Sequence, residues 1–187
     1  MKMIKRIAIV MLILFTGVFV FRGWIYRHIA MYKSFGLREK YGVTDSSLMK
    51  LLAENEVNLD DAEISKVINR SLSLTSEQLN FTDSTNDLDP NKLVTSKTAH
   101  CVGYANFFAT VCNYQIQKHN LSQEWEATAR IGHIFLFGTD IHKYFKSTFF
   151  KDHDFVTIEN KVTGEVFAVD PTLYDYSGIK LVRYQVK

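Results

Sequence analysis

The order of the predicted elements indicates an α+β fold with an antiparallel sheet. Apolar residues recur at helical spacing as far as residue 120, and from there the alternation becomes strand-like. The strand candidates follow one another with hairpin-length connections, without helices between them, which favours antiparallel pairing. The chain has 187 residues, of which 47% are hydrophobic and 22% charged. After an apolar N-terminal stretch, enough chain remains for one domain with a core.

Residues 1–27 are predicted to be a membrane anchor or signal segment. Lys2, Lys5 and Arg6 precede an uncharged run from Ile7 to Phe21. This run is short for a span of about 20 residues, but apolar flanks and snorkelling charged ends make up the length. Because Phe19-Val20-Phe21 is a poor cleavage site, we favour an uncleaved anchor over a cleaved signal, and both over a buried helix of a soluble protein.

The flanking charges do not orient this segment. Basic residues lie on both sides of it, so the positive-inside rule gives no answer. The working expectation is an extracytoplasmic domain at residues 44–187, joined by a connector at 28–43, with secretion after signal cleavage as the alternative. The net charge of +2 comes largely from residues near the anchor and indicates no nucleic-acid partner. The oligomeric state is not predicted.

Two helices are expected early in the domain. Thr44-Asp45-Ser46 caps the first, which runs through Leu48, Leu51 and Leu52. Asn58 or Asp60 caps the second, whose apolar stripe consists of Ile64, Val67, Ile68 and Leu72. The following stretch, Ser73 to Ala99, is rich in Ser, Thr, Asn and Asp and predicts a long loop. Such a loop in a compact domain often lines a functional site.

A third helix is predicted to begin at Cys101 and to end near residues 118–120. Its buried stripe consists of Cys101, Ala105, Phe108, Ala109, Cys112 and Ile116. Strands are expected at 127–137, 154–159 and 165–170, with a short fourth at 184–187.

Cys101 is the candidate nucleophile. At a helix N-terminus the backbone N–H groups and the macrodipole stabilise a thiolate, which lowers the thiol pKa from about 8.5. Cys112, in mid-helix, is expected to be a small core residue. Eleven helical residues place the two about 16 Å apart, beyond the roughly 7 Å that a disulfide allows, so both are predicted to be free thiols.

His153 and Asp170 complete a candidate triad. A turn of Asn160-Lys161-Val162-Thr163 would place His153 directly opposite Asp170, with Cβ atoms about 5 Å apart. The carboxylate would fix the imidazole tautomer, and the other ring nitrogen would take the thiol proton. A register slip of one residue would send the two side chains to opposite faces. Asp152 and Asp154 should point away from that face and be solvated.

The remaining histidines are assigned structural roles. His100 is expected to act as a loop or cap residue, and His133 is rejected as the base because no Asp-Pro partner follows it at hairpin distance. Surface or interface positions are expected for His28, His119 and His142. A set of His142, Asp152, His153 and Asp154 matches no closed zinc spacing, and no calcium-loop motif is present. No metal or other cofactor is predicted.

The segments AHCVGYANFF, HDFVTIEN and VFAVDPT resemble the core of transglutaminase-like proteins, over about Thr95 to Tyr174. In that family a Cys opens a helix, a His begins a later strand, and an Asp before Pro-Thr ends the next strand. The resemblance implies a papain-like core of N-terminal helices packed on three to four antiparallel strands. It assigns Cys101 as the nucleophile, His153 as the base and Asp170 as the residue that orients the base.

The chain departs from the family pattern at three places. Phe155 replaces a frequent Trp, Ala99-His100 replaces a Gly or Gln before the Cys, and an insertion from Gly138 to Phe150 carries Phe145, Phe149 and Phe150. No upstream polar residue for an oxyanion hole is identified.

The expected function is that of a cysteine-dependent amide hydrolase or acyl transferase working through a thioester, with a protein or peptide substrate. Hydrolysis is favoured over crosslinking, because crosslinking requires an amine to outcompete water at the acyl-enzyme. The first alternative is a catalytically inactive binding domain of the same fold tethered at a membrane. The second is a membrane-anchored α+β domain without a site.

Overall fold

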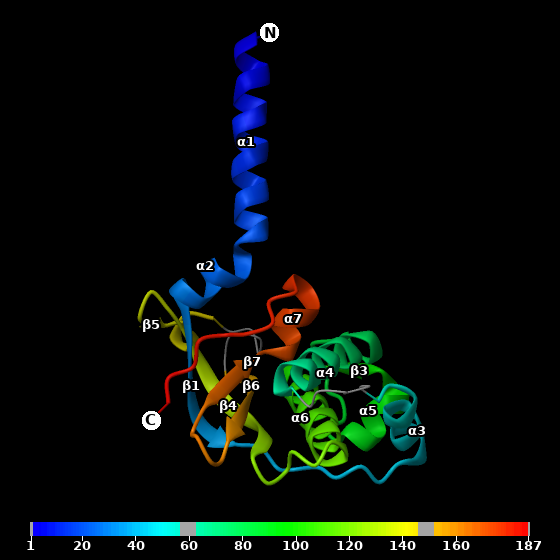
Figure 1. The fold of residues 1–187 in the computed structure, drawn as a ribbon. Coiled ribbons are helices and arrows are strands. Elements are labelled where there is room, and N and C mark those ends of the chain that lie inside the picture. Colours follow the sequence, from blue (N-terminus) through cyan, green and yellow to red (C-terminus); the bar gives the residue numbers. More distant parts are fainter. Residues whose placement is uncertain (1, 57–62, 146–151, 187) are drawn as a thin grey trace.

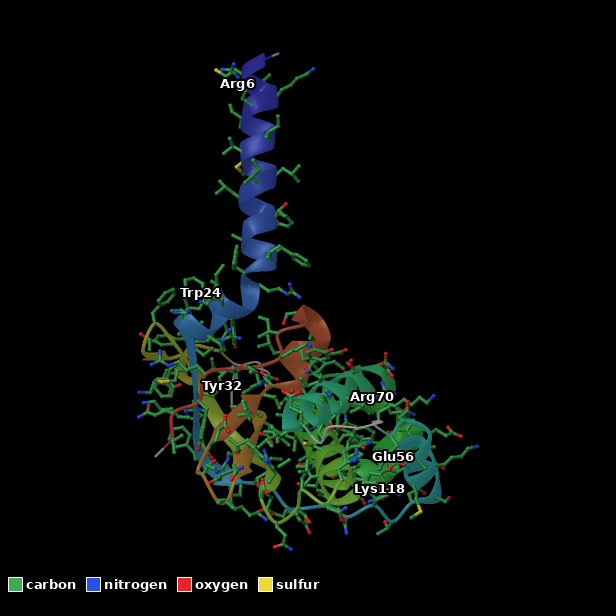
Figure 2. The ribbon with its side chains drawn as sticks, viewed as in Figure 1. Arg6, Trp24, Tyr32, Glu56, Arg70 and Lys118 are labelled. Carbon is green, nitrogen blue, oxygen red and sulfur yellow. The ribbon has the colours of Figure 1, made fainter. Side chains whose placement is uncertain are left out.

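An apolar helix, α1 (Lys2–Val20), begins the chain and projects from the folded domain (Figure 1). Its segment Met3–Val20 is long and apolar enough to cross a membrane, and none of it is buried against the rest of the protein (Figure 2). The expected apolar span is therefore present, and the alternative of a buried helix is wrong. The computed structural model describes residues 2–56, 63–145 and 152–186.

A second helix, α2 (Arg22–Ile29), leads directly into strand β1 (Ala30–Leu37). The predicted connector at residues 28–43 is thus wrong between residues 30 and 37, which belong to the sheet. Ala30 and Tyr32 alternate with less buried neighbours, as in a half-buried strand. Lys33 suits the position, since β1 is an edge strand and edge strands commonly carry charges.

The main sheet has the order β1-β4-β6-β7, and all of its pairings are antiparallel. The strands predicted in the second half are present as β4 (Trp125–Leu136), β6 (His153–Asn160) and β7 (Val166–Val169). A short β5 (Thr139–Asp140) pairs with the end of β4. The fold class, mixed helix and antiparallel sheet, is confirmed.

The predicted fourth strand at 184–187 is wrong in the part that the structure describes. Tyr184 forms an isolated parallel bridge with Tyr32 and no further ladder, and Lys187 lies outside the described residues. Strand β1 takes the place of that strand in the sheet.

The early helices are α3 (Ser46–Glu54) and α4 (Ile64–Gln78). Asp45 caps α3 as predicted, because its side chain accepts from the N–H groups of Ser47 and Leu48. The proposed caps of α4, Asn58 and Asp60, lie outside the described residues.

The predicted loop from Ser73 to Ala99 is wrong over most of its length. Helix α4 continues to Gln78, Asp89 caps a further helix, α5 (Pro90–Ser96), and β2 (Asn80–Phe81) pairs in parallel with β3 (Thr98–Ala99). The hydroxyl of Thr75 donates to the carbonyl of Ser71 at 2.7 Å, so helix α4 accommodates this buried polar side chain. Residues 82–89 remain as an irregular connection.

Helix α6 (Cys101–Lys118) packs across β4 and β6, and α4 packs beside it (Figure 1). The apolar stripe predicted for α6 forms the core here. Residues buried in this layer include Val67, Leu72, Ala105, Phe108, Cys112, Ala127, Val156 and Ile158. The opposite face of the sheet carries a second cluster, with Tyr32, Ile134, Phe155, Ala168 and Val182.

The hairpin of β6 and β7 has a register two residues from the one predicted. Glu159 pairs with Val166 rather than with Gly164, and Val156 pairs with Val169. The turn is longer because Asn160 stays in β6 and its side chain accepts from the N–H groups of Val162 and Thr163. A shift of two keeps every side chain on its face, so Asp170 lies diagonal to His153, not opposite it.

Gly132 in β4 permits the close packing of this face. It pairs with His153, and a Cβ atom added there would lie 2.4 Å from Cε1 of Phe155 and 2.7 Å from the carbonyl oxygen of Lys33. We expect Gly132→Ala to lower the free energy of unfolding by about 1–3 kcal/mol through overpacking, measured by urea unfolding of the full chain in detergent micelles. Gly42→Ala is the control, because no heavy atom lies within 4 Å of the added carbon. Equal stability of both variants would contradict the packing argument.

Candidate functional site

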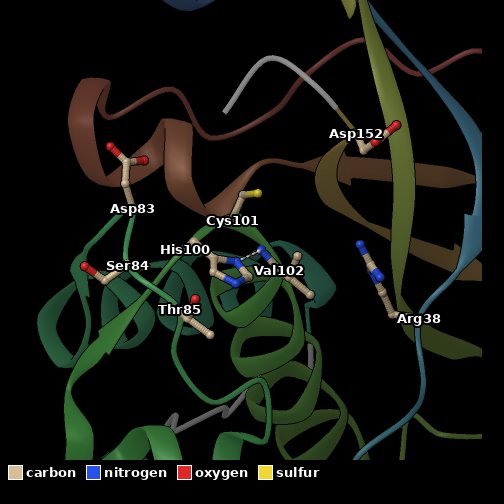
Figure 3. A pocket seen from close by; sticks show the side chains of 8 residues that line it. All are labelled: Arg38, Asp83, Ser84, Thr85, His100, Cys101, Val102 and Asp152. Carbon is tan, nitrogen blue, oxygen red and sulfur yellow. Dashed lines mark hydrogen bonds between the residues drawn. The ribbon is translucent and has the colours of Figure 1, made fainter. Parts of the chain in front are cut away.

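Cys101 is the first residue of α6 and is nearly buried, with 4% of its surface exposed. His100 caps the helix, because its Nδ1 accepts from the N–H of Val102 at 3.2 Å, which confirms the predicted cap role. The Cys101 side chain lines a pocket of about 470 Å³ (Figure 3). Both cysteines are free thiols, as predicted.

The structure brings His153 and Asp170 together. His153 begins β6, and its Nε2 lies 2.6 Å from Oδ2 of Asp170, with both side chains fully buried. Asp170 follows β7 and caps α7 (Pro171–Ser177), where its Oδ1 accepts from the N–H of Leu173 at 2.9 Å. The predicted pair thus forms in the diagonal register.

His100 and His153 both lie near the thiol of Cys101 and act together to lower its pKa. Because Asp170 occupies Nε2 of His153, the Nδ1 atom is the one that can face the sulfur. The pairing of β7 with β6 covers Val156–Glu159, and β7 ends at Val169. The backbone of Asp154, next to His153 in β6, also lowers the pKa of the thiol. The three predicted site residues are therefore gathered at the end of a strand.

The charges of the pair stabilise each other. Burial alone would raise the pKa of Cys101, but the hydrogen bonds from His100 and His153 and the charge of His153 lower it to about 7. Burial alone would lower the pKa of His153, yet Asp170 and the thiolate raise it to about 10. Each group therefore favours the charged form of the other. Cys112 differs, since burial raises its pKa to about 12 and it lies in the core as predicted.

Tyr32 belongs to the site, and the sequence analysis missed it. Its hydroxyl donates to Oδ2 of Asp170 at 2.8 Å, and the hydroxyl of Tyr26 lies 2.7 Å from it. Burial and the charge of Asp170 raise the pKa of Tyr32 well above its usual range, so it remains a donor. The alternation at Ala30 and Tyr32 is one of burial and not of residue type, because Met31 between them is also apolar, so the sequence carries no clear signal for this strand.

Asp154 is not solvated, and that prediction is wrong. The carboxylate is fully buried and accepts from Nε and Nη2 of Arg38 at 2.6 and 2.9 Å. Burial raises its pKa, and Arg38 partly offsets this effect. It does point away from His153, as strand alternation requires. Asp152, on the other side of His153, is exposed as expected.

Most of the residues that line the pocket are polar, although apolar atoms make up the larger part of its surface. Figure 3 shows Cys101 between the loop residues Asp83, Ser84 and Thr85 and the side chains of Arg38 and Asp152. The irregular part of the predicted long loop is short, but it does line the pocket. In the aromatic insertion Phe145 is 44% exposed, and Phe149 and Phe150 lie outside the described residues.

His133 has a carboxylate partner that the sequence analysis did not anticipate. Its Nδ1 lies 3.0 Å from Oδ2 of Asp140 across the short β4–β5 hairpin, without a following proline. His142 and Asp152 lie beside it. In the set weighed earlier as a metal site, His153 and Asp154 instead bond to Asp170 and Arg38.

Two further histidines lie away from the pocket. His28 is exposed, and His119 is the C-cap of α6.

Comparison of the chain with protein-family models, with curated proteins and with solved structures finds no match.

The pKa values predict a selective thiol. In buffer with a chelator, iodoacetamide should alkylate Cys101 at a rate that rises through pH 7 and levels off, because the thiolate forms with a pKa of about 7. Cys112 should remain unlabelled below pH 9, since its pKa is about 12. Peptide mass spectrometry assigns the label.

Removing His153 should shift the pH dependence of Cys101 alkylation to higher pH. In His153→Ala the hydrogen bond and charge that lower the thiol pKa are lost, so the midpoint should move above pH 7. Asp170→Asn should move it in the same direction, because the imidazolium loses its stabilising charge. Equal, slow labelling of both cysteines would refute the arrangement.

The Tyr32 hydrogen bond should contribute to stability. Tyr32→Phe removes a bond to a buried carboxylate, worth about 1.5–3 kcal/mol, together with the neutral bond to Tyr26. Tyr26→Phe is the matched control, because it removes the neutral bond alone, worth about 0.5–1.5 kcal/mol. Urea unfolding should therefore rank Tyr32→Phe as the less stable variant, and the reverse order would contradict the assignment.

Proposed function

We propose that the chain is a cysteine-dependent amide hydrolase or acyl transferase with a papain-like, transglutaminase-like core. Cys101 is the nucleophile, His153 the general acid and base, and Asp170 the residue that orients His153. The observation that carries the proposal is the buried 2.6 Å bond between His153 and Asp170 next to a thiol that lines a pocket. The paired hydrogen bonds and charges lower the pKa of that thiol.

Acylation begins with attack of the Cys101 thiolate on an amide carbonyl carbon. The negative charge moves to the carbonyl oxygen, where backbone N–H groups at the beginning of α6 stabilise it. Protonated His153 then gives its proton to the leaving nitrogen, the C–N bond breaks, and a thioester on Cys101 remains. Asp170 stabilises the imidazolium before this transfer and holds the ring through Nε2.

Deacylation reverses the roles. Neutral His153 takes a proton from water or from an amine, which attacks the thioester carbon. Collapse of the intermediate releases the acid or the new amide and restores the thiolate–imidazolium pair. Water gives hydrolysis and an amine gives acyl transfer. Hydrolysis is favoured, since an amine must outcompete water in a pocket that is open to solvent.

The substrate class follows from the pocket and from the anchor. The charged and hydroxyl side chains of Asp83, Ser84, Thr85 and Arg38, together with apolar surface between them, suit a protein or peptide chain. The apolar span of α1 would hold the domain at a membrane, with the domain on the extracytoplasmic side. A secreted form after cleavage of α1 is the alternative localisation.

The proposal is tested with an acyl donor that allows acylation and deacylation of Cys101 to be observed separately. The full chain in detergent micelles is mixed with p-nitrophenyl acetate. We expect a burst of nitrophenol, an acetyl group on Cys101 by mass spectrometry, and then continuing turnover. His153→Ala should lower the turnover by about 10²–10⁴-fold, and Cys101→Ser should abolish the burst. Release of acetate or, with added glycinamide, of its N-acetyl product distinguishes hydrolysis from transfer.

Cys112→Ala is the matched control, since Cys112 is a thiol of the same helix outside the site. It should retain both the burst and the turnover. An acetyl-Cys101 that persists in water and in glycinamide would refute the enzyme and favour an inactive binding domain. Absence of any acylation would do the same. A peptide library then identifies the amide, with Cys101→Ser as the blank.

A further inference from the structure

A second cluster of ligand-type side chains lies beside the pocket. Nε2 of His133 and Nδ1 of His142 each lie 3.4 Å from Oδ1 of Asp152. The two imidazole rings stack with centroids 4.0 Å apart. The candidate ligand atoms of the three residues all lie within 4.8 Å of one another. Strand β4 supplies His133, the turn after β5 supplies His142, and the residue before β6 is Asp152.

Two of these distances fit a tetrahedral ion, although the stacked rings would have to tilt apart to direct both nitrogen lone pairs at it. Zinc binds imidazole nitrogen and carboxylate oxygen at about 2.0–2.2 Å, which makes the edges of its tetrahedron roughly 3.3–3.5 Å long. Two of the three edges in this cluster already have that length. The N–H of Asp152 also donates to Nδ1 of His142, but at 3.3 Å this bond is long, and a metal–nitrogen bond would replace it.

Asp140 holds both histidines in place. Its Oδ2 lies 3.0 Å from Nδ1 of His133, which directs Nε2 towards Asp152, and its Oδ1 accepts from the backbone N–H of His142. A carboxylate behind a ligand histidine fixes the ring and its tautomer in metal sites. The ring of Phe35 covers the other face of His133, with centroids 4.4 Å apart. The side chains of His133 and His142 are only 18% and 23% exposed.

From this geometry we propose that His133, His142 and Asp152 form a binding site for a divalent transition-metal ion, with Zn²⁺ the best fit. Two imidazoles and one carboxylate leave a fourth position open, as in zinc sites that bind water or a substrate oxygen. Asp152 also lines the pocket of Cys101 (Figure 3). The open position therefore lies at the rim of that pocket, where it can take a carbonyl or carboxylate oxygen of a bound molecule.

The site does not depend on the chemistry of Cys101, so it can be tested separately. The full chain in detergent micelles is stripped with a chelator, dialysed and titrated with Co²⁺. We expect one ion per chain, the visible absorption of tetrahedral Co²⁺ and its loss when Zn²⁺ is added. Asp140→Asn should weaken binding by about 10–100-fold. His133→Ala and His142→Ala should each weaken it further.

Cys101→Ser and His28→Ala are the controls, because they replace a nearby thiol and a histidine elsewhere on the surface. Both variants should bind Co²⁺ as tightly as the unaltered chain does. Neither should show a thiolate-to-cobalt charge-transfer band, because no cysteine is a ligand in the proposed site. Thermal unfolding in chelator checks that each variant folds, and Zn²⁺ should raise the midpoint of the unaltered chain but not that of His133→Ala. Absence of binding, its persistence in both histidine variants, or its loss in Cys101→Ser would overturn the proposal.

Discussion

The buried carboxylate of Asp170 is the constraint on which the rest of the structure depends. A charge fully removed from water is costly unless hydrogen bonds and an opposite charge compensate it. Here the donors come from three parts of the chain, His153 of β6, Tyr32 of β1 and the N–H of Leu173 in α7. Satisfying one carboxylate therefore fixes the edge strand, the strand that carries the imidazole and the helix that follows β7.

The sulfur reaches the imidazole through an interruption of the sheet. Because the chain turns into α7 after Val169, the β6–β7 pairing stops at Val156, and the first residue of α6, Cys101, lies near His153 at the beginning of β6. Arg38 secures the same stretch through its bidentate pair with buried Asp154. Asp154 is thus held by a salt bridge through its side chain and by pairing with β4 through its backbone.

The sequence predicted the elements with strong local patterns and lost those that depend on tertiary contacts. The stripe of α6, the cap at Asp45 and the strands β4, β6 and β7 were predictable because periodicity and capping are local. The meeting of His153 and Asp170 was predictable although the register was wrong, since a shift of two preserves the face. Strand β1 and α5 were missed because a charged edge strand and a short capped helix resemble loops. Tyr32 and Arg38 were missed because their partners, Asp170 and Asp154, lie 138 and 116 residues away in the sequence. Asp140 was missed because the carboxylate partner of a histidine was expected only in an Asp-Pro pair.

The passage from α1 to the domain contains no flexible tether. After Phe21 the chain enters α2 and then β1, and the side chain of Arg22 bonds to the carbonyl of Ser177 at the end of α7, the helix that Asp170 caps. This bond ties α2 to the domain, and a single residue separates α1 from α2. With α1 in a bilayer, so short a connection would keep the pocket close to the lipid surface. Its encounters would then be a two-dimensional search among molecules that share that layer.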